Sequence, residues 1–317
     1  MISFQAPVQE QINAYDPAMI FHQQNPERLE LVVNDPIRYR AVPVLVYLPA
    51  QYSPAPVVMF CHGLGGSCKD NAYLGQHWAA NGYMAIFIQH PGSDDSIWKG
   101  KAPDERITAL KGAASPRNFM LRLKDIPLVL DQLEKWNTTK GHALHERMDL
   151  DRIGMSGHSF GAMTTQAVSG QTTSLGNASF TDLRIKAAII FSPSTPHGED
   201  TTQMFGNVKI PWMLITGTKD IAPIGTVDMK SRLAVFPALP PGGKYELVLY
   251  EAKHSDFSIR SLSKNTKATN LHYNQAIVAL STAFWDTWLG ENVSADAWLH
   301  GDGPNSVLKK KDAWQWK

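Results

Sequence analysis

The chain has 317 residues, of which 43% are hydrophobic and 19% charged, which is enough apolar material for one large core. Thirty basic residues against twenty-nine acidic ones leave a formal net charge of +1, so the composition gives no sign of a nucleic-acid partner. No apolar run reaches the roughly 18 residues that a membrane span needs. This length fits one large α/β domain as well as two small ones, and the order of apolar segments described next leads us to expect a single domain over residues 1–317.

Short apolar runs alternate with helical or loop segments along the chain. The runs expected to form strands are residues 29–34, 42–48, 56–61, 83–88, 152–156, 187–191, 212–216 and 245–250. Continuous apolar runs of this length are typical of strands buried on both faces. The pattern predicts an α/β protein with a mostly parallel twisted sheet and helices on both faces.

Three segments between and after these strands complete the expected organisation. Residues 91–117, rich in Gly, Pro and charge, predict a long irregular excursion over one edge of the sheet. A helical apolar pattern follows, with Asp125 as its expected N-cap and Pro127 in its first turn. The last long helix is expected over residues 271–289, with a C-terminal tail over 300–317.

The N-terminal sequence lacks a basic stretch followed by an apolar one, so it predicts no signal peptide. A cytoplasmic location is expected unless a leader has been removed. Cys61 and Cys68 are the only cysteines in the sequence, and their spacing matches no metal motif. We expect free thiols, with a local disulfide as the alternative.

The segment Gly157-His158-Ser159-Phe160-Gly161 follows a predicted strand and precedes a helical pattern. The G-x-S-x-G string alone occurs by chance in roughly a tenth of such chains. Its setting is more specific, because a strand, a tight turn and a helix hold a serine hydroxyl clear of the sheet edge. We expect Ser159 to be a nucleophile; the alternative is a glycine-rich turn with an incidental serine.

A serine hydroxyl needs a neighbouring base, and in this architecture the acid and then the histidine follow the serine along the chain. His254 comes just past an apolar strand and is the expected base. The competing histidines lie inside other motifs or a predicted helix: His62, His158 and His272.

Asp220 is the expected acid, because it follows the strand that ends near Gly217. Its carboxylate would accept the second imidazole N–H and fix the tautomer. The alternative is an aspartate that caps a turn. Asp256 is too close to His254 along the chain, and Asp182 precedes a different strand.

The glycine-rich loop His62-Gly63-Leu64-Gly65-Gly66 follows the third predicted strand. A serine hydrolase needs a backbone donor from this loop and a second one after the nucleophile. The N–H groups of Leu64 and Phe160 are therefore the expected oxyanion hole. The loop could instead cradle a phosphate, but it lacks the lysine of a P-loop and the dinucleotide spacing.

With these residues in hand, the chain resembles the serine-type, dienelactone-hydrolase-like branch of the α/β-hydrolases over residues 31–288. Residues 62–65, 124–133 and 157–161 are similar to plasma-type platelet-activating-factor acetylhydrolases. That resemblance implies an oxyanion hole at the backbones of Leu64 and Phe160. Residues 216–223 and 252–257 resemble cutinase-like polyester hydrolases, which implies that Asp220 and His254 are catalytic.

The chain departs from each of these families at one place. The acetylhydrolases carry their acid after the preceding strand, where this chain has Ser192, so Asp220 is favoured and lipid specificity is not implied. The polyester hydrolases have a short, open surface in place of residues 91–117. Dienelactone hydrolases proper use a cysteine where this chain has Ser159.

The sequence predicts a carboxylic ester hydrolase that works through an acyl-enzyme on a small or lipid-like ester, with no cofactor and no metal. The alternatives are an amidase or peptidase with the same residues, and a binding protein that has kept the fold without catalysis. Trp98, Phe119, Met163 and Ile221 lie near motif ends and are expected to line the substrate pocket, with ordinary packing as the alternative. Two roles are open for the late tryptophans, docking on the body or self-association into a homo-oligomer: Trp298, Trp314 and Trp316.

Overall fold

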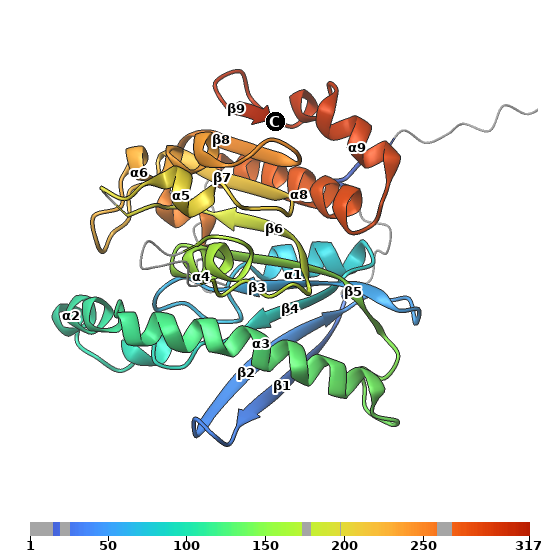
Figure 1. Cartoon of the computed structure of the whole chain (residues 1–317), viewed down its shortest axis with the longest axis vertical. Coiled ribbons are helices and arrows are strands. Elements are labelled where there is room, and N and C mark those ends of the chain that lie inside the picture. The colour runs from blue at the N-terminus through green and yellow to red at the C-terminus, as the bar shows by residue number, and fades with distance from the viewer. Residues whose placement is uncertain (1–14, 20–25, 173–178, 197, 259–267) are drawn as a thin grey trace, which may run out of the picture.

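A computed structural model describes residues 15–19, 26–172, 179–196, 198–258 and 268–317. Its described strands form one sheet in the order β1-β2-β4-β3-β5-β6-β7-β8-β9 (Figure 1). The strands are β1 Glu27–Asp35, β2 Arg40–Leu48, β3 Ala55–Cys61, β4 Met84–Ile88, β5 Met148–His158, β6 Ile185–Phe191, β7 Trp212–Lys219, β8 Lys244–Lys253 and β9 Ala313–Trp316. Strands β4, β3, β5, β6, β7 and β8 run parallel, while β1, β2 and β9 are antiparallel to their neighbours. The predicted α/β class and all eight predicted strands are confirmed.

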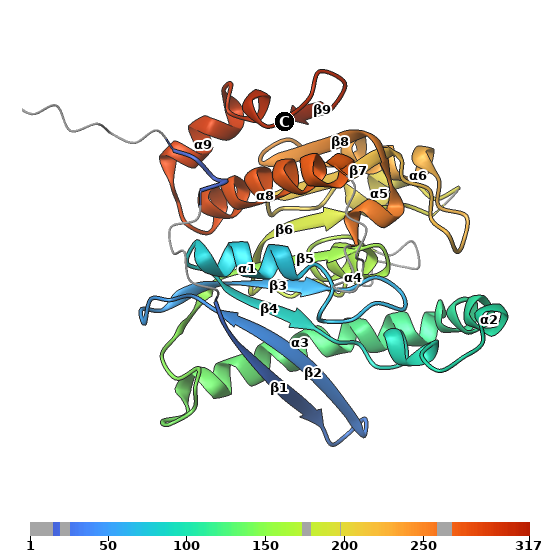
Figure 2. The same cartoon turned by 180° about the vertical axis from the view of Figure 1, so that it is seen from behind.

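Helices cover both faces of this sheet because its strands are apolar on both sides. Along β3, Val58 and Phe60 pack with the helices α1 (Ala72–Ala80) and α8 (Ala268–Trp288), seen in Figure 2. The alternate residues Val57 and Met59 pack on the opposite face with α3 (Pro116–Thr138). The helix α4 (Phe160–Val168) covers this second face beside α3. The remaining helical elements are η1 Asp95–Ile97, α2 Pro103–Ala113, α5 Thr201–Phe205, α6 Met229–Leu233, α7 Val235–Ala238, η2 His254–Phe257, α9 Val293–His300 and η3 Pro304–Ser306.

The start of α3 differs from the prediction. The helix begins at Pro116, and its N-cap is Ser115, whose hydroxyl accepts the Asn118 N–H at 3.2 Å. Pro127 therefore lies inside the helix and not in its first turn. The prediction of Asp125 as N-cap was wrong, because that buried carboxylate is engaged in ion pairs with arginines of the β1–β2 pair instead.

The excursion over residues 91–117 is more regular than predicted. It contains η1, α2 and the beginning of α3, and it lies beyond the carboxyl ends of the parallel strands (Figures 1 and 2). Most side chains of α2 are exposed, so the helix has little apolar periodicity that the sequence could reveal. Only its last turns pack inward, where Ala113 is buried.

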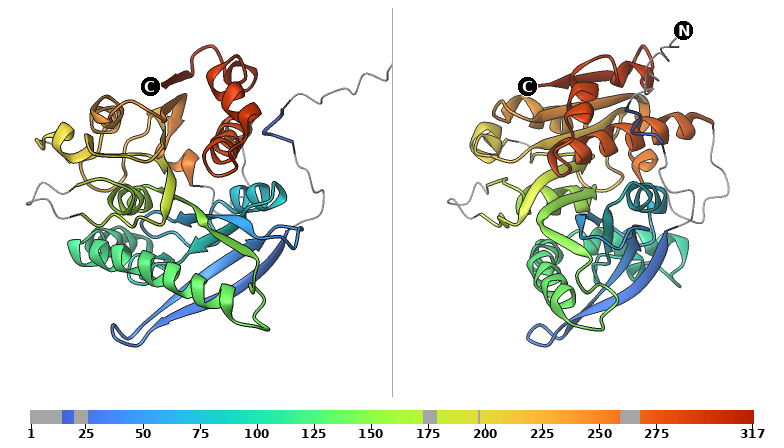
Figure 3. Two further views of the ribbon diagram at one scale, coloured as in Figure 1. Left: turned by 45° about the vertical axis from the view of Figure 1, so that its right-hand side comes forward. Right: turned by 90° about the vertical axis from the view of Figure 1, so that its right-hand side faces the viewer.

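The tail over residues 300–317 supplies the strand β9, which pairs with β8 and ends the sheet on the side opposite to β1 and β2 (Figure 3). Trp314 stacks on Tyr245 of β8 with a centroid distance of 5.6 Å, and its Nε1–H donates to the Leu299 carbonyl at 3.3 Å. Trp314 thus packs on the body of the protein, while Trp316 is 44% exposed.

Cys61 and Cys68 are both buried and unpaired, so the prediction of free thiols is confirmed. Within the described part of the chain, no helix is long and apolar enough to cross a membrane.

Candidate functional site

Ser159 lies at the turn between β5 and α4, at the carboxyl edge of the sheet. Its backbone has φ 57° and ψ −112°, a conformation that a residue with a Cβ rarely adopts. The Ser159 N–H donates to the Phe191 carbonyl of the neighbouring strand β6 at 3.0 Å, which holds the turn against the sheet. The side chain is partly exposed, so the hydroxyl is accessible at the end of the strand.

Two glycines allow this turn to pack closely. A Cβ on Gly157 would lie 2.4 Å from the Gly161 carbonyl oxygen, and a Cβ on Gly161 would lie 2.0 Å from the Cys61 carbonyl oxygen. Real Cβ atoms do not approach backbone oxygens so closely. The glycines of the G-x-S-x-G string are therefore required by contact between β5, α4 and the end of β3.

We expect Gly161→Ala to destabilise the protein by about 1–3 kcal/mol or more, because the new methyl group meets rigid backbone. Urea unfolding measures the change. Gly112→Ala is the matched control, since a Cβ on this exposed glycine of α2 would meet no atom within 4 Å. Alanine favours a helix over glycine by roughly 1 kcal/mol, so the control should be neutral or stabilising. Equal stability of the two variants would contradict the steric argument.

The structure brings the three predicted side chains together at strand ends on the same edge of the sheet. Asp220 follows β7, and His254 is the first residue after β8. His254 Nε2 lies 2.9 Å from Ser159 Oγ, and His254 Nδ1 lies 2.7 Å from Asp220 Oδ1. Because a carboxylate only accepts, Nδ1 carries the ring proton and Nε2 is free to accept the serine hydroxyl.

Arg232 on α6 also belongs to this cluster, and no pattern along the chain singles it out. Its side chain is 2% exposed, and Nε lies 3.0 Å from Asp220 Oδ1 and donates to the Asp220 carbonyl at 2.6 Å. Nη1 donates to the Ser192 carbonyl at 2.7 Å, which ties the ends of β6 and β7 together. Thr216 donates its hydroxyl to Asp220 Oδ2 at 2.9 Å.

These contacts determine the charge of Asp220, which is fully buried. Burial alone would raise the pKa of this carboxyl group. The hydrogen bond from His254 and the positive charge of Arg232 outweigh burial and hold the pKa below its ordinary value of 3.8. Asp220 is therefore ionised at neutral pH, and it can stabilise a positive charge on the imidazole of His254.

The glycine-rich loop lies directly against Ser159. A Cβ on Gly63 would be 3.4 Å from Ser159 Cβ. The Gly65 N–H donates to the Ser93 carbonyl at 2.8 Å, and Gly66 N–H donates to the Gly63 carbonyl at 3.1 Å, so the loop is tightly fixed. Leu64 lies within it, next to Gly63, and Phe160 is the first residue of α4.

The four predicted pocket residues lie around these motifs. Trp98 donates Nε1–H to the Gly65 carbonyl at 2.7 Å, and the Phe119 ring is 6.0 Å from the Phe160 ring. Met163 is one helical turn beyond Ser159 and is 37% exposed, and Ile221 follows Asp220 and is 62% exposed. Their role in binding a substrate stays a prediction.

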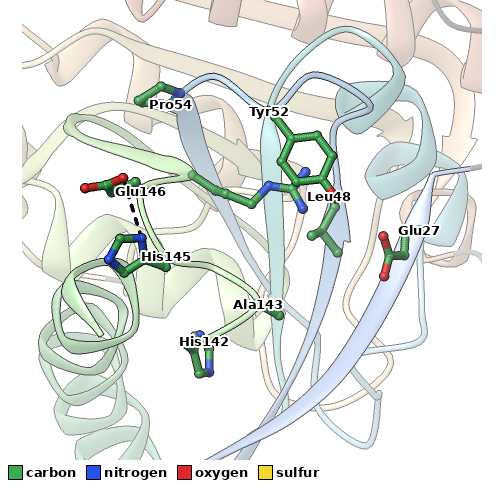
Figure 4. A pocket seen from close by; sticks show the side chains of 9 residues that line it. Glu27, Leu48, Tyr52, Pro54, His142, Ala143, His145 and Glu146 are labelled. Atoms are coloured by element: carbon green, nitrogen blue, oxygen red, sulfur yellow. Dashed lines mark ion pairs between the residues drawn. The ribbon is translucent and has the colours of Figure 1, made fainter. Parts of the chain in front are cut away.

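A surface pocket and the possible metal ligands also bear on the site around Ser159. A surface pocket lined by Tyr52, His142 and Glu146 (Figure 4) lies by the amino end of β5, whereas Ser159 follows its carboxyl end. In the described part of the chain, no three or more His, Cys, Asp or Glu side chains are grouped so that they could hold a metal ion.

Three imidazoles near the carboxyl edge of the sheet are buried, those of His62, His90 and His158. Burial lowers the pKa of His90 from 6.5 to about 4 and lowers the pKa values of the other two well below 6.5. These rings therefore stay neutral in the folded chain at a pH where the unfolded chain binds protons.

We expect the free energy of unfolding to fall as the pH drops from 6.5 towards 4, by about 1.4 kcal/mol per pH unit for each such imidazole. Urea unfolding over this range measures the slope. In His90→Asn the free energy of unfolding should change less steeply with pH, by about 1.4 kcal/mol per pH unit, which is the contribution of one imidazole. An identical slope in the variant and the wild type would contradict the assignment of His90 as a neutral buried ring.

Comparisons with models of known protein families and with curated proteins return no match.

Proposed function

We propose that this protein is a serine carboxylic ester hydrolase of the α/β-hydrolase fold that acts on a small ester through an acyl-enzyme. One observation carries the proposal: His254 bridges Ser159 and Asp220 with contacts of 2.9 Å and 2.7 Å. The imidazole lies between a hydroxyl and a buried ionised carboxylate, and its ring proton is on the nitrogen that faces the carboxylate. This arrangement gives the serine nucleophile its own base.

The first half of the reaction forms the acyl-enzyme. Ser159 Oγ attacks the ester carbonyl carbon while its proton moves to His254 Nε2, and the carbonyl π electrons move onto the oxygen. The N–H groups of Leu64 and Phe160 would face this oxyanion, and Asp220 would stabilise the imidazolium. As the tetrahedral intermediate collapses, the C–O bond to the alcohol breaks and the alcohol oxygen takes the proton from His254.

The second half releases the acid. A water molecule takes the place of the alcohol, gives a proton to His254 Nε2 and attacks the acyl carbon. Collapse of the second intermediate breaks the bond to Ser159 Oγ, which recovers its proton from His254. The balanced reaction consumes one water and one ester and yields one acid and one alcohol.

The sheet supports the same proposal independently of the side-chain distances. The strand order β1-β2-β4-β3-β5-β6-β7-β8, with β2 antiparallel, agrees with the α/β-hydrolase fold. Ser159 follows β5, Asp220 follows β7 and His254 follows β8, which is the chain order expected of that fold. The strained backbone at Ser159 agrees with a nucleophile elbow.

A fluorophosphonate probe and a panel of esters test the proposal. We expect the probe to label the wild-type protein at Ser159, located by mass spectrometry of the digested adduct. We expect hydrolysis of p-nitrophenyl esters, with a rate that falls as the acyl chain lengthens. Faster cleavage of matched anilides than of esters would favour an amidase, and absence of labelling and of hydrolysis together would favour a non-catalytic binding protein.

A further inference from the structure

Arg122 is a buried cation close to the proposed oxyanion hole. It lies on α3 and is 0% exposed. Within the described part of the chain its guanidinium group forms no ion pair, and the carboxylates of Asp125 and Asp94 act on it only from a longer distance. Burial lowers its pKa from 12.5 to about 10, so the group remains charged at neutral pH. A buried charge without a direct counter-ion is expensive to maintain, which raises the question of what it does there.

Arg122 contacts the backbone just before the proposed Leu64 donor and the side chain of Phe160, whose N–H is the other proposed donor. Nη1 donates to the His62 carbonyl at 2.8 Å, and Nη2 lies 3.5 Å from the Gly63 carbonyl oxygen. The guanidinium carbon is 4.6 Å from the centroid of the Phe160 ring, within the range of a cation–π contact. One side chain thus holds the loop before Leu64 and the side chain of Phe160.

The Gly63 carbonyl fixes the direction of the Leu64 N–H, because both belong to the same peptide group. In a trans peptide the C=O and N–H bonds point in opposite directions. The Gly63 oxygen faces Arg122 Nη2, the Gly66 N–H at 3.1 Å and His62 Nδ1 at 2.6 Å. These donors turn the Leu64 N–H away from Arg122.

The positive charge at this loop comes from Arg122 and not from a histidine. His62 Nε2 accepts the backbone N–H of His90 at 3.0 Å, so the proton of the His62 ring is on Nδ1 and the ring is neutral. His90 is also neutral and donates from Nδ1 to Asp125 at 3.0 Å. Arg122 is therefore the charged group that contacts this loop directly, and Asp125 and Asp94 act on it from a longer distance.

We propose that Arg122 is a positioning residue for the oxyanion hole: it aligns the Leu64 N–H donor, packs against the Phe160 ring and supplies a positive potential at the hole. This inference rests on the proposed function. Donors that are already aligned stabilise the transition state without reorganisation, so their disturbance should lower kcat more than it changes KM.

The test compares Arg122→Met with a matched buried arginine. Arg147 is 8% exposed, lies 4.3 Å from the ring centroid of Tyr52 and donates to the Pro49 carbonyl at 3.0 Å. It has the same kinds of contact as Arg122 but immediately precedes β5, whose other end carries Ser159 (Tyr52 is labelled in Figure 4). Arg147→Met therefore controls for the loss of a buried arginine as such.

Each variant is assayed for kcat and KM per active site, counted by burst titration, and for inhibition by a trifluoromethyl ketone. The tetrahedral adduct of this ketone places an oxyanion in the hole, whereas KM reflects mainly the ground state. For Arg122→Met we expect kcat to fall about 100-fold, the inhibition constant to rise by a similar factor, and KM to change little. Arg147→Met should keep wild-type kcat and inhibition.

Arg122→Lys carries the same test if the methionine variant does not fold. Lysine keeps the charge but lacks the planar fork, so kcat should still fall, by about 10-fold. Normal kcat per active site in the folded variant, or a rise in KM alone, would overturn the inference. Failure of the proposed function is seen separately, since the wild type would then show no hydrolysis that depends on Ser159.

Discussion

Replacement of Ser159 by alanine should lower kcat for ester hydrolysis by about a millionfold, because the nucleophilic oxygen is lost while the rest of the site is kept. Alanine retains the Cβ and the strained backbone conformation of the turn. The variant should therefore unfold at nearly the same temperature as the wild type. Steady-state assays and thermal unfolding followed by circular dichroism measure the two quantities.

The same experiment extends to His254→Ala and to the double variant. In the proposed mechanism Ser159 and His254, 2.9 Å apart, act as one unit, so the double variant should be no slower than the slower single variant. If the loss of kcat in the double variant equalled the product of the two single losses, the two side chains would act independently. Hydrolysis that survives Ser159→Ala at the wild-type rate would refute the mechanism.

Replacement of Asp220 by asparagine should have two large effects at once. A neutral amide no longer stabilises the imidazolium, and we expect kcat to fall about 10,000-fold. The same change leaves Arg232, which is 2% exposed, without its counter-ion. Loss of one partner of a buried ion pair costs about 3–5 kcal/mol, so the free energy of unfolding should fall as well.

Asp256→Asn is the matched control for this variant. Asp256 lies two residues after His254, but its carboxylate accepts the Lys253 N–H at 2.7 Å and does not contact the imidazole. We expect wild-type kcat and only a small change in stability. A larger loss of kcat in Asp256→Asn than in Asp220→Asn would reassign the acid.

Residue patterns predicted the central sheet well because buried parallel strands consist of unbroken apolar runs. They also placed Ser159, Asp220 and His254 at strand ends, since chain order and strand ends can both be read from the sequence. The strand β9 was not predicted: it is only four residues long, and its burial depends on pairing with β8.

Side chains that depend on the assembled fold were not predicted. Arg122 donates to the carbonyl group of His62, 60 positions away. Arg232 donates to the carbonyl groups of Ser192 and Pro193, 40 and 39 positions away. Similarly, Asp125 looked like a helix cap because its partners, Arg38 and Arg40, are more than 80 residues away. No local pattern distinguishes such residues from ordinary surface charges.

The backbone of Ser159 places stability and activity in opposition at one residue. A non-glycine residue in such a conformation costs roughly 1–3 kcal/mol. Ser159→Gly would release this strain, and the greater freedom of glycine in the unfolded chain would offset only part of the gain. The inactive glycine variant should therefore unfold at a higher temperature than the wild type. A search for heat-resistant variants of this protein should include an activity screen, because selection for thermal stability alone would favour variants that have lost Ser159.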